Sequence, residues 1–332
     1  MPKIEVNESL FFELLGRSMD AKTLESTLTV AKAELDGWDQ SSASAAERSI
    51  KIELNDTNRP DLWSTAGIAR QLRVYLGGGI PSYPFFSREG QKQPSKYRAV
   101  VDSSVKDVRP YLACFVISGK AISDPILKDA IQTQEKLCSN FGRKRRSVSM
   151  GMYRIDLVQW PLSYRGADPD ATKFVPLQMT ESMSLRRILS EHPKGKEYGH
   201  IISGYKKFPV LVGADGGILS MAPIINSADI GAVQVGDKDI LVEFTGTDLE
   251  SVSLSASMVA CDFHDAGYEI RPVTVDYPWE TAFGRSITFP YYFQTPASVD
   301  SGKATKLLGL QLGPERVMAA LARMGIQSES HG

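Results

Sequence analysis

The segment Pro209–Asn226, which reads PVLVGADGGILSMAPIIN, constrains the fold of this chain more than any other. A β-branched apolar run enters a Gly-rich turn at residues 213–217, and a second apolar run leaves it. An Asp-Gly step between two strand-like runs is a strong short-range signal for a β-hairpin. Because proline fits poorly inside a central strand, Pro223 places the second run at a sheet edge or ends it.

Asn226 follows the apolar pair Ile224-Ile225, so we expect it at the mouth of the hairpin. An amide in that position suits a group that binds a small ligand. Asparagine is also a common residue in a turn that simply closes a surface hairpin, because its side chain bonds to nearby backbone. The residues alone leave both roles open.

The length and composition indicate a soluble protein of two or three compact domains. The chain has 332 residues, of which 42% are hydrophobic and 23% charged, as in ordinary globular proteins. No apolar run approaches the length of a membrane span, and the first residues, Met1–Glu5, lack the apolar core of a signal peptide. We therefore expect no membrane association.

Cysteine and histidine usage argues against disulfides and structural metal sites. The three cysteines, Cys114, Cys138 and Cys261, are widely spaced and odd in number. With four histidines and no paired His/Cys spacing, a structural zinc site is not expected. A reducing cytoplasm is the simplest setting for such a chain.

Charge is nearly balanced, with a formal net charge of −1. A protein that binds nucleic acid mainly through bulk charge is usually more basic, so any RNA contact must be local or come from a partner chain. The one dense basic run is Arg143-Lys144-Arg145-Arg146. These residues suit a solvated helix end, where they complement the helix dipole, and they also suit contacts with phosphates.

The pattern of apolar residues predicts an α+β, multidomain fold with mixed or antiparallel sheets and packed helices. Residues 1–85 read as an amino-terminal α+β module. Its expected elements are helices at Ser9–Leu15 and Asp20–Ala33, a loop at Ser41–Ala46, a strand at Ile50–Leu54, a turn at Asn55–Asp61, and a helix that is capped by Asp61 or Ser64 and ended by Gly77–Gly79.

Pro81–Pro94 is rich in proline, serine and aromatic residues and reads as an exposed linker. A longer α+β domain is expected over residues 96–275, followed by a third segment over residues 276–332. The central strands are expected at Tyr97–Val101, Leu112–Ser118, Ser147–Met152, Ile240–Thr245 and Tyr268–Val275, and the central helices at Pro125–Asn140, Met183–Ser190 (capped by Thr180 or Ser182) and Asp248–Ala266. The third segment is expected to hold a strand at Ile287–Tyr292 and helices at Ser298–Leu308 and Gly313–Met324.

The order of several segments resembles the β subunit of phenylalanyl-tRNA synthetase in its archaeal and eukaryotic-type version. The matching segments are KFVPL from Lys173, EHPKGKEYGHI from Glu191, FPVLV from Phe208, ILSMAPIIN from Ile218 and TGTD from Thr245. A further segment, NDTNRPDL from Asn55 followed by GIARQLRVYLG, resembles the amino-terminal module of the family. The resemblance covers nearly all of the chain.

The resemblance implies that residues 96–275 are a B3/B4-type tRNA-editing domain in the centre of the chain, and that residues 276–332 begin a winged-helix-like B5 module. It also implies an amino-terminal fragment of a longer polypeptide, without the catalytic-like domain that pairs with the α subunit. The editing domain of the family hydrolyses tyrosine wrongly attached to phenylalanine tRNA.

The full enzyme of this family is an aminoacyl-tRNA synthetase, a phenylalanine–tRNA ligase of cytoplasmic protein biosynthesis. The resemblance implies α-subunit partners in a heterotetramer, phenylalanine tRNA as the bound RNA, and ATP and Mg²⁺ as the ligands of the full synthetase. No cofactor and no metal are expected in this fragment itself.

By matched motif, the resemblance places the editing pocket in the predicted hairpin. Leu211 is the expected ring contact, Ser220 a polar group beside the ester or water, and Asn226 the orienter of the substrate. Ser220 and Asn226 are the expected catalytic residues. The alternatives are core packing for Leu211, a strand-surface serine and a turn asparagine.

Glu243 lies inside an apolar strand, where a carboxylate needs a partner or a ligand. It is the candidate acceptor for the hydroxyl of a bound tyrosine. Thr245 and Asp248 are further candidates for substrate binding, although Asp248 also stands where a helix cap is expected. Lys194 and Lys196 are candidates for tRNA contact together with the basic run, and a solvated loop is their alternative.

The chain departs from the family pattern at one place. Many relatives carry a His-Asp pair after the glycine that follows the basic run, whereas Tyr153 and Arg154 stand here and Asp156 is kept. A histidine that helps catalysis in relatives therefore has no counterpart at this position. His192, which precedes Pro193, reads as a helix cap.

Two other functions stay open beside an active editing module. One is a non-catalytic tRNA-binding or scaffold part with a vestigial pocket, which the departure at Tyr153 and Arg154 favours. The other is a free-standing editing hydrolase, which the additional modules at both ends make less suitable. The intact set of Leu211, Ser220 and Asn226 favours the editing module.

Overall fold

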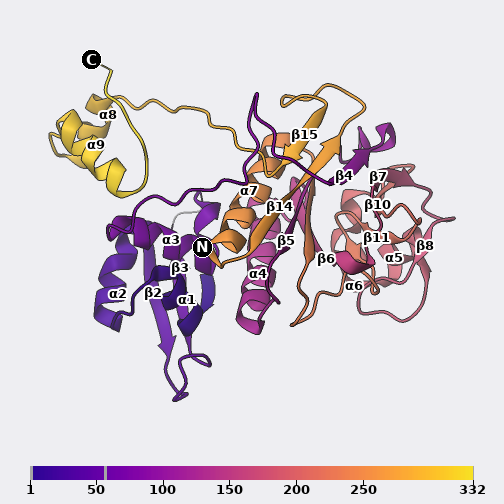
Figure 1. The fold of residues 1–332 in the computed structure, drawn as a ribbon, viewed down its shortest axis with the longest axis horizontal. Helices are drawn as coiled ribbons and strands as arrows, with labels where there is room; N and C mark the ends of the chain where they lie inside the picture. Colours follow the sequence, from indigo (N-terminus) through magenta and orange to yellow (C-terminus); the bar gives the residue numbers. More distant parts are fainter. Residues whose placement is uncertain (1–2, 56–57, 332) are drawn as a thin grey trace. The chain divides into compact units, whose positions relative to one another are not determined.

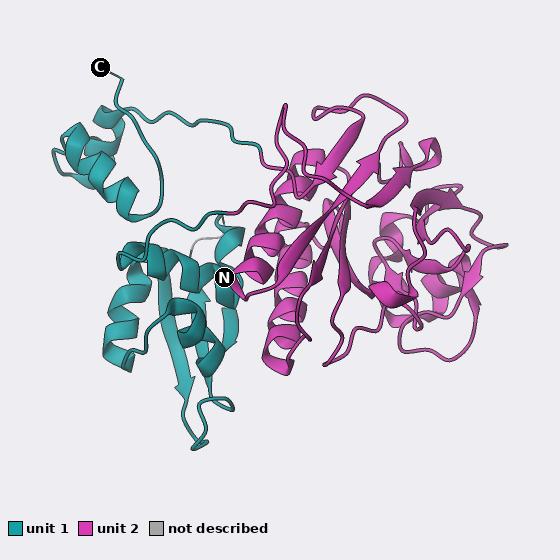
Figure 2. Ribbon diagram, in the orientation of Figure 1, with its two compact units in different colours: residues 1–82, 293–332 teal, residues 83–292 magenta. Residues whose placement is uncertain are grey.

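The computed structural model describes residues 3–55 and 58–331. Contacts divide the chain into two compact units, one made of residues 1–82 and 293–332 and the other of residues 83–292 (Figure 2). The described elements mix helices with mainly antiparallel sheets, so the predicted α+β class is confirmed (Figure 1). Residues 56–57 of the predicted turn lie outside the described residues.

The first unit contains a three-stranded antiparallel sheet in the order β1-β3-β2. Its elements are β1 (Lys3–Asn7), α1 (Glu8–Leu15), α2 (Ala21–Leu28), β2 (Ala33–Asp39), β3 (Ser49–Leu54) and α3 (Thr65–Tyr75). Alternate residues of β1 and β3, such as Ile4 and Ile52, are buried beneath the helices. Ser64 caps α3 by accepting a hydrogen bond from the Gly67 amide at 2.9 Å, which decides between the two expected caps.

The predicted helix Asp20–Ala33 is wrong in its second half. Helix α2 ends at Leu28, a 3-10 turn covers Thr29–Ala31, and Lys32 adopts a left-handed conformation with φ 50°. The chain then enters β2, which pairs with β3. Tertiary pairing with β3 therefore overrides the helical spacing of the apolar residues.

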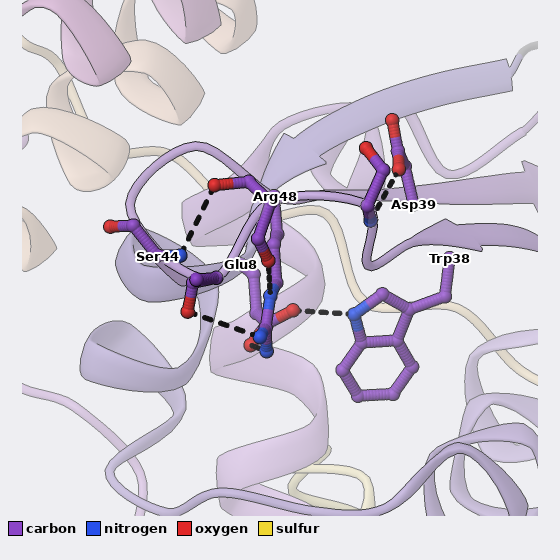
Figure 3. Close-up of polar contacts among 8 residues, drawn as sticks. Glu8, Trp38, Asp39, Ser44 and Arg48 are labelled. Carbon is purple, nitrogen blue, oxygen red and sulfur yellow. Dashed lines mark hydrogen bonds and ion pairs between the residues drawn. The ribbon is translucent and has the colours of Figure 1, made fainter.

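The loop between β2 and β3, predicted at Ser41–Ala46, is fixed onto α1 by Arg48 and Glu8 (Figure 3). The Arg48 guanidinium donates from Nε to the Ser42 carbonyl at 2.7 Å and contacts Glu8 Oε1 at 3.5 Å. The Trp38 indole donates to Glu8 Oε2 at 2.5 Å. The buried Glu8 carboxylate thus has polar partners on both oxygens, as burial of a charge requires.

The second unit contains a mixed sheet in the order β12-β11-β10-β7-β4-β14-β5-β13-β6, with β15 also paired to β14. The strands are β4 (Tyr97–Val101), β5 (Tyr111–Ser118), β6 (Val148–Arg154), β7 (Leu162–Ala167), β10 (Phe208–Val212), β11 (Ile218–Met221), β12 (Ile225–Asn226), β13 (Ile240–Gly246), β14 (Glu269–Asp276) and β15 (Ser286–Phe289). A separate pair is formed by β8 (Lys173–Phe174) and β9 (Met183–Ser184). Only β4 pairs in parallel, with β14 and β7, among the described strands of this sheet.

Helices cover parts of this sheet (Figure 1). They are α4 (Asp124–Lys136, continued by a π turn at Leu137–Phe141), α5 (Leu185–Glu191), α6 (Pro193–Tyr198) and α7 (Leu249–Asp265). The predicted apolar face of α7, including Val252, Ala256 and Val259, is buried. Helix α5 begins two residues later than predicted, because its cap is Ser184 rather than Thr180 or Ser182.

The predicted linker Pro81–Pro94 is not an exposed linker throughout. Phe85, Phe86 and Ser87 are buried, and the Ser87 amide donates to the Pro290 carbonyl at 3.0 Å. The Tyr292 amide donates in turn to the Ser87 carbonyl at 2.7 Å. The second compact unit therefore begins at residue 83, earlier than the expected start at residue 96.

Residues 293–332 contain α8 (Ser301–Leu308) and α9 (Pro314–Arg323), close to the two helices expected there. None of the helices in the described ranges 3–55 and 58–331 is long and apolar enough to cross a membrane.

The two ends of the strand order in the second unit meet. The Asn226 side-chain amide of β12 donates to the Met152 carbonyl of β6 at 3.3 Å. The Arg154 amide at the end of β6 donates to the Ile230 carbonyl, just after β12, at 3.0 Å. The sheet therefore curls until its first and last strands face each other, and this closure positions the candidate site.

Candidate functional site

A cavity of about 420 Å³ lies inside the second unit, where β6, β11 and β12 meet α4. Five sequence-predicted residues line it: Ser220, Asn226, Glu243, Arg145 and Lys194. Its size lies in the range of pockets that hold small molecules. The remaining lining residues are Leu127, Ile131, Gln134, Glu135, Ser149, Met150, Met152, Tyr153, Leu177, Gln178, Met221, Ala222, Pro223, Ile224, Ile225, Gly231, Ala232 and Val233.

The predicted hairpin supplies one wall of the cavity. Strands β10 and β11 pair antiparallel with Leu211 opposite Ser220, as the Asp-Gly turn predicts. The chain then reverses again at Ala222–Ile224, and Asn226 of β12 comes to lie opposite Ser220. Pro223 lies in this second turn, so β11 ends before it. The second turn is what brings the two polar side chains to the same place.

The Ser220 hydroxyl is a buried polar group with unused bonding capacity. Its side chain is 3% exposed, and its oxygen has no hydrogen-bond partner of acceptable geometry among the described residues. The hydroxyl of Tyr153 lies beside it. A buried hydroxyl without a partner costs free energy, so the Ser220 hydroxyl is available for a hydrogen bond with a ligand or with water.

Tyr153 and Glu243 form a buried pair at one end of the cavity. The Tyr153 hydroxyl donates to Glu243 Oε2 at 2.7 Å and lies 3.3 Å from Asn226 Oδ1. Strand β13 places Glu243 opposite Gly151 of β6, and the phenol of Tyr153 folds back over Gly151 to reach it. A carboxylate inside an apolar strand thus has the partner that its burial demands.

Burial raises the pKa of the Glu243 carboxyl to about 7, against the opposing effects of the Tyr153 hydrogen bond and the Arg109 charge. Burial, reinforced by the Glu243 charge, raises the pKa of the Tyr153 hydroxyl well above its ordinary value. Tyr153 therefore keeps its proton near neutral pH and acts as the donor of the pair.

The basic run is held in place by Arg109, which is 1% exposed. The Arg109 guanidinium donates to the Arg145 and Arg146 carbonyls at 3.0 Å each, and to the hydroxyls of Thr245 and Ser149 at 2.9 and 3.0 Å. Residues 143–145 are all left-handed, with φ between 51° and 67°. The basic run is therefore a turn whose backbone carbonyls are held by the buried Arg109 side chain.

Arg145 differs from the other residues of the run. Its guanidinium donates to the Pro223 and Ile224 carbonyls at 3.1 and 2.9 Å and lies 4.3 Å from the centre of the Tyr198 ring. It thus supports the turn between β11 and β12 from the cavity side, and the expectation of a solvated helix end is wrong for this residue. The exposed members of the predicted basic set are Arg143, Lys144, Arg146 and Lys196, which are not among the lining residues.

Comparison with known proteins gives consistent matches. Residues 1–78 match the family model described as "Phe-tRNA synthetase beta subunit B1 domain". A solved "N-terminal Fragment Of The Phenylalanyl-tRNA Synthetase Beta-Subunit" from Pyrococcus horikoshii is similar over 99% of this chain and 91% of that one, with a TM-score of 0.86 and 34% identity. The chain belongs to the phenylalanyl-tRNA synthetase β-subunit family. The predicted family membership is confirmed.

Curated members of the family match at similar levels. Phenylalanine–tRNA ligase β subunits of Borreliella burgdorferi and Treponema pallidum subsp. pallidum are each 42% identical to the chain. The alignments cover 99% and 98% of this chain but 57% and 59% of those proteins. The chain thus spans a little over half the length of these family members.

Three residues that the family resemblance suggested for substrate binding do not line the cavity. Leu211 is buried in β10 between Tyr164 and Ser220, and Thr245 is bound by Arg109. Asp248 is exposed and caps α7 by accepting a hydrogen bond from the Ser251 amide at 2.8 Å. Core packing and capping are therefore what the structure shows for Leu211 and Asp248.

The structure adds residues that sequence reasoning missed. Arg109 gave no signal, because a single arginine in a loop usually lies at the surface. Gly151, which stands two residues before Tyr153, was also missed. His192 behaves as expected for a cap, with its Nδ1 accepting from the Lys194 amide at 3.1 Å. Within the described residues, no group of three His, Cys, Asp or Glu side chains is arranged to hold a metal ion.

Proposed function

We propose that this chain is part of a phenylalanine–tRNA ligase β subunit of the archaeal and eukaryotic type, and that its central B3/B4-type domain hydrolyses tyrosine mischarged onto phenylalanine tRNA. Family membership supports the β-subunit part of this proposal, and the similarity to the Pyrococcus horikoshii fragment supports the archaeal and eukaryotic type. The observation that supports the second half is the cavity wall on which Asn226 of β12 lies opposite Ser220 of β11, whose hydroxyl has no hydrogen-bond partner of acceptable geometry among the described residues.

Editing of this kind compensates for the weak selectivity of a synthetic site between phenylalanine and tyrosine. A synthetic site built for phenylalanine is largely apolar, and an apolar pocket only weakly rejects a ligand that adds one hydroxyl. A second site with polar groups in an apolar cavity accepts tyrosine and leaves the phenylalanyl ester alone. The cavity has this character, because Ser220 and Asn226 lie among apolar residues such as Met152, Met221 and Ile225.

Hydrolysis of an aminoacyl ester requires no reactive side chain. An aminoacyl ester is already activated, so a positioned water is sufficient and no side-chain nucleophile is needed. Ser220 and Asn226 orient the bound aminoacyl group or that water. Arg145 and Lys194, which line the cavity, attract the phosphates of the tRNA end, with Arg143, Lys144, Arg146 and Lys196 as further cations on the exposed surface.

The ligase reaction belongs to the proposed full complex. There the chain joins α subunits in a heterotetramer in the cytoplasm, and ATP, Mg²⁺ and phenylalanine tRNA bind to the assembled synthetase. The carboxy-terminal segment, residues 276–332, is the proposed start of the B5 module.

One observation favours a second candidate, a tRNA-binding scaffold with a vestigial pocket. The Glu243 carboxylate already binds a tyrosine hydroxyl, that of Tyr153, within the folded chain. A pocket filled by its own side chain has less room for a substrate.

Deacylation of tyrosyl-tRNA by the purified chain separates the two functions. An editing domain releases tyrosine faster than phenylalanine, and the Asn226→Ala variant loses most of this rate. Binding of phenylalanine tRNA without any deacylation above the uncatalysed rate supports the scaffold and contradicts the editing proposal. Asp248→Ala is the matched control, since Asp248 does not line the cavity and serves as a helix cap.

A further inference from the structure

Two side-chain amides bind to the outer edge of strand β6, at the wall of the cavity. Strand β6 ends the order of described strands, so alternate carbonyls of β6 point away from β13. The Met152 carbonyl accepts from the Asn226 amide at 3.3 Å, and the Met150 carbonyl accepts from Gln134 Nε2 at 2.5 Å. Because a strand rises about 3.3 Å per residue, these two carbonyls lie about 7 Å apart along the edge, with one amide bound to each.

Gln134 presents a donor and an acceptor that a ligand can use. Its bond to Met150 fixes the amide but takes only one of the two N–H groups. Within the described residues, no hydrogen bond uses the second N–H or the oxygen Oε1. Helix α4 carries Leu127, Ile131 and Gln134 on one face, since they stand at positions i, i+4 and i+7, and all three line the cavity.

Apolar side chains accompany this amide at the cavity wall. Leu127 is half-buried and Ile131 is 43% exposed, and the loop after β12 adds the half-buried Ala232 and Val233 to the lining. An apolar surface beside an amide with a free donor and acceptor suits a flat heterocycle. The faces of a nucleobase make apolar contacts, whereas its edge carries the hydrogen-bonding groups.

Gly231 connects this loop with Asn226. A Cβ at position 231 would come within 2.3 Å of Asn226 Cβ, so only glycine allows the loop to pack so closely against the asparagine. The Tyr153 hydroxyl, which is bonded to Glu243, lies 3.3 Å from Asn226 Oδ1. Asn226 therefore contacts both the loop and the buried pair at the Glu243 end of the cavity.

We propose that the surface formed by Leu127, Ile131, Gln134, Ala232 and Val233 binds the adenine of the terminal nucleotide of tRNA. This inference rests on the proposed editing function, in which Asn226 lies beside the ester. The aminoacyl group is esterified to the terminal ribose, so the base lies one ribose away from the ester. The Gln134 amide, about 7 Å from that of Asn226 along β6, stands at a suitable distance for hydrogen bonds to the base.

The Gln134 amide matches one edge of adenine. Its Oε1 accepts from the exocyclic amino group and its second N–H donates to the ring nitrogen N7, the bidentate pairing that glutamine makes with adenine. Hypoxanthine carries a carbonyl oxygen in place of the amino group, so two acceptors would face each other. Loss of one hydrogen bond of this kind should weaken the binding of an inosine ligand about tenfold.

The test uses two non-hydrolysable probes, 3′-amino-3′-deoxyadenosine and 3′-amino-3′-deoxyinosine, each acylated with tyrosine on the 3′ nitrogen. Titration calorimetry on the whole chain gives the ratio of the two dissociation constants. We expect the unaltered chain to prefer the adenosine probe about tenfold and Gln134→Leu to bind both probes within about twofold of each other. Gln132→Leu is the matched control, because it is the same change on α4 outside the cavity lining, and it should keep the preference.

A second variant tests the apolar part of the surface. Ile131→Ser should weaken both probes about threefold without changing their ratio, because it removes apolar contact with the faces of either base. Ile131 is exposed, so this change should alter the free energy of unfolding by less than about 0.5 kcal/mol. The thermal midpoint of each variant is measured beside the titration.

Equal affinity of the unaltered chain for the two probes overturns the inference. A folded Gln134→Leu variant that keeps the adenosine preference does so as well, and so does an Ile131→Ser variant that binds as tightly as the unaltered chain. Should Gln134→Leu fail to fold, the unaltered chain and Ile131→Ser decide.

Tyrosyl-tRNA deacylation by the unaltered chain is measured in parallel and separates this inference from the editing function. A chain that deacylates but shows no preference between the bases keeps the editing function and loses only the adenine site. A chain that neither deacylates nor binds the probes loses both.

Discussion

At the scale of single residues, Glu243 couples the site to the stability of the domain. Its carboxyl has a pKa of about 7 in the folded protein, above the ordinary value of 4.5, because burial disfavours the charged form. The folded state therefore holds this proton more tightly than the unfolded chain. The stability that it contributes is fully present below about pH 4.5 and is lost as the pH rises through 7.

Replacing Glu243 by glutamine removes this pH dependence. The unaltered chain should lose about 2–3 kcal/mol of unfolding free energy between pH 4.5 and 8 that the Glu243→Gln variant does not lose. The magnitude follows because one pKa unit corresponds to about 1.4 kcal/mol. Urea unfolding at a series of pH values measures the difference. Glu250→Gln, at an exposed position on α7, is the control for the same substitution outside the cavity. A constant difference across the range would contradict the buried-carboxyl assignment.

Alanine substitutions at Asn226 and Leu211 are expected to have different effects on activity and stability. Asn226→Ala removes two long contacts, both 3.3 Å, so it should cost about 1 kcal/mol of stability or less while lowering tyrosyl-tRNA deacylation about 10²-fold. Leu211→Ala leaves a cavity in the sheet and should cost about 2–5 kcal/mol. Paired measurement of deacylation rate and thermal midpoint checks both. The site assignment is wrong if Asn226→Ala keeps full activity or loses it only by unfolding.

At the scale of elements, Arg109 makes the basic turn part of the sheet. The carbonyls of Arg145, Arg146 and Thr245 all accept from its guanidinium. Arg109→Met should leave these groups without their donor and destabilise the second unit by about 3 kcal/mol or more. Arg143→Met, an exposed change in the same turn, should cost less than about 0.5 kcal/mol. Urea unfolding curves of the two variants give the comparison, and equal midpoints would show that the clamp contributes nothing.

The elements also show how far sequence reasoning reaches. The hairpin β10-β11 was predictable because an Asp-Gly turn between apolar runs is a local signal. The reversal at Ala222–Ile224 and the closure of β12 onto β6 depend on contacts between distant segments, which no local pattern records. Strands β1 and β2 were missed for the same reason, since both are defined by pairing with β3. Among the site residues, Glu243 was found because a carboxylate in an apolar strand is conspicuous, whereas its partner Tyr153 stood out only as a departure from the family.

At the scale of the whole molecule, the chain passes twice between its two compact units, at residues 82–83 and 292–293. Segments 83–87 and 290–292 are tied together within the second unit by backbone hydrogen bonds of 2.7 and 3.0 Å. The segments just outside this tie, residues 77–80 and 294–300, are exposed. Proline-rich composition alone had placed the first boundary too late.

Limited proteolysis tests this division. A protease of broad specificity such as subtilisin cuts where backbone is exposed and able to open locally, so we expect the first cuts at residues 77–82 and 293–300. The stable product should begin near Tyr83 and end near Tyr292, because Phe85, Phe86 and Ser87 are buried and Ser87 is bonded to the strand that leads to Tyr292. Mass spectrometry of the product identifies both ends.

A product that begins near Tyr97 would mean that residues 83–95 are an exposed linker after all, and a first cut inside 200–260 would contradict the second unit as a single folded body. Ser87→Pro supplies a matched variant, since it removes the amide that donates to Pro290 and should shift the first cut into residues 83–95.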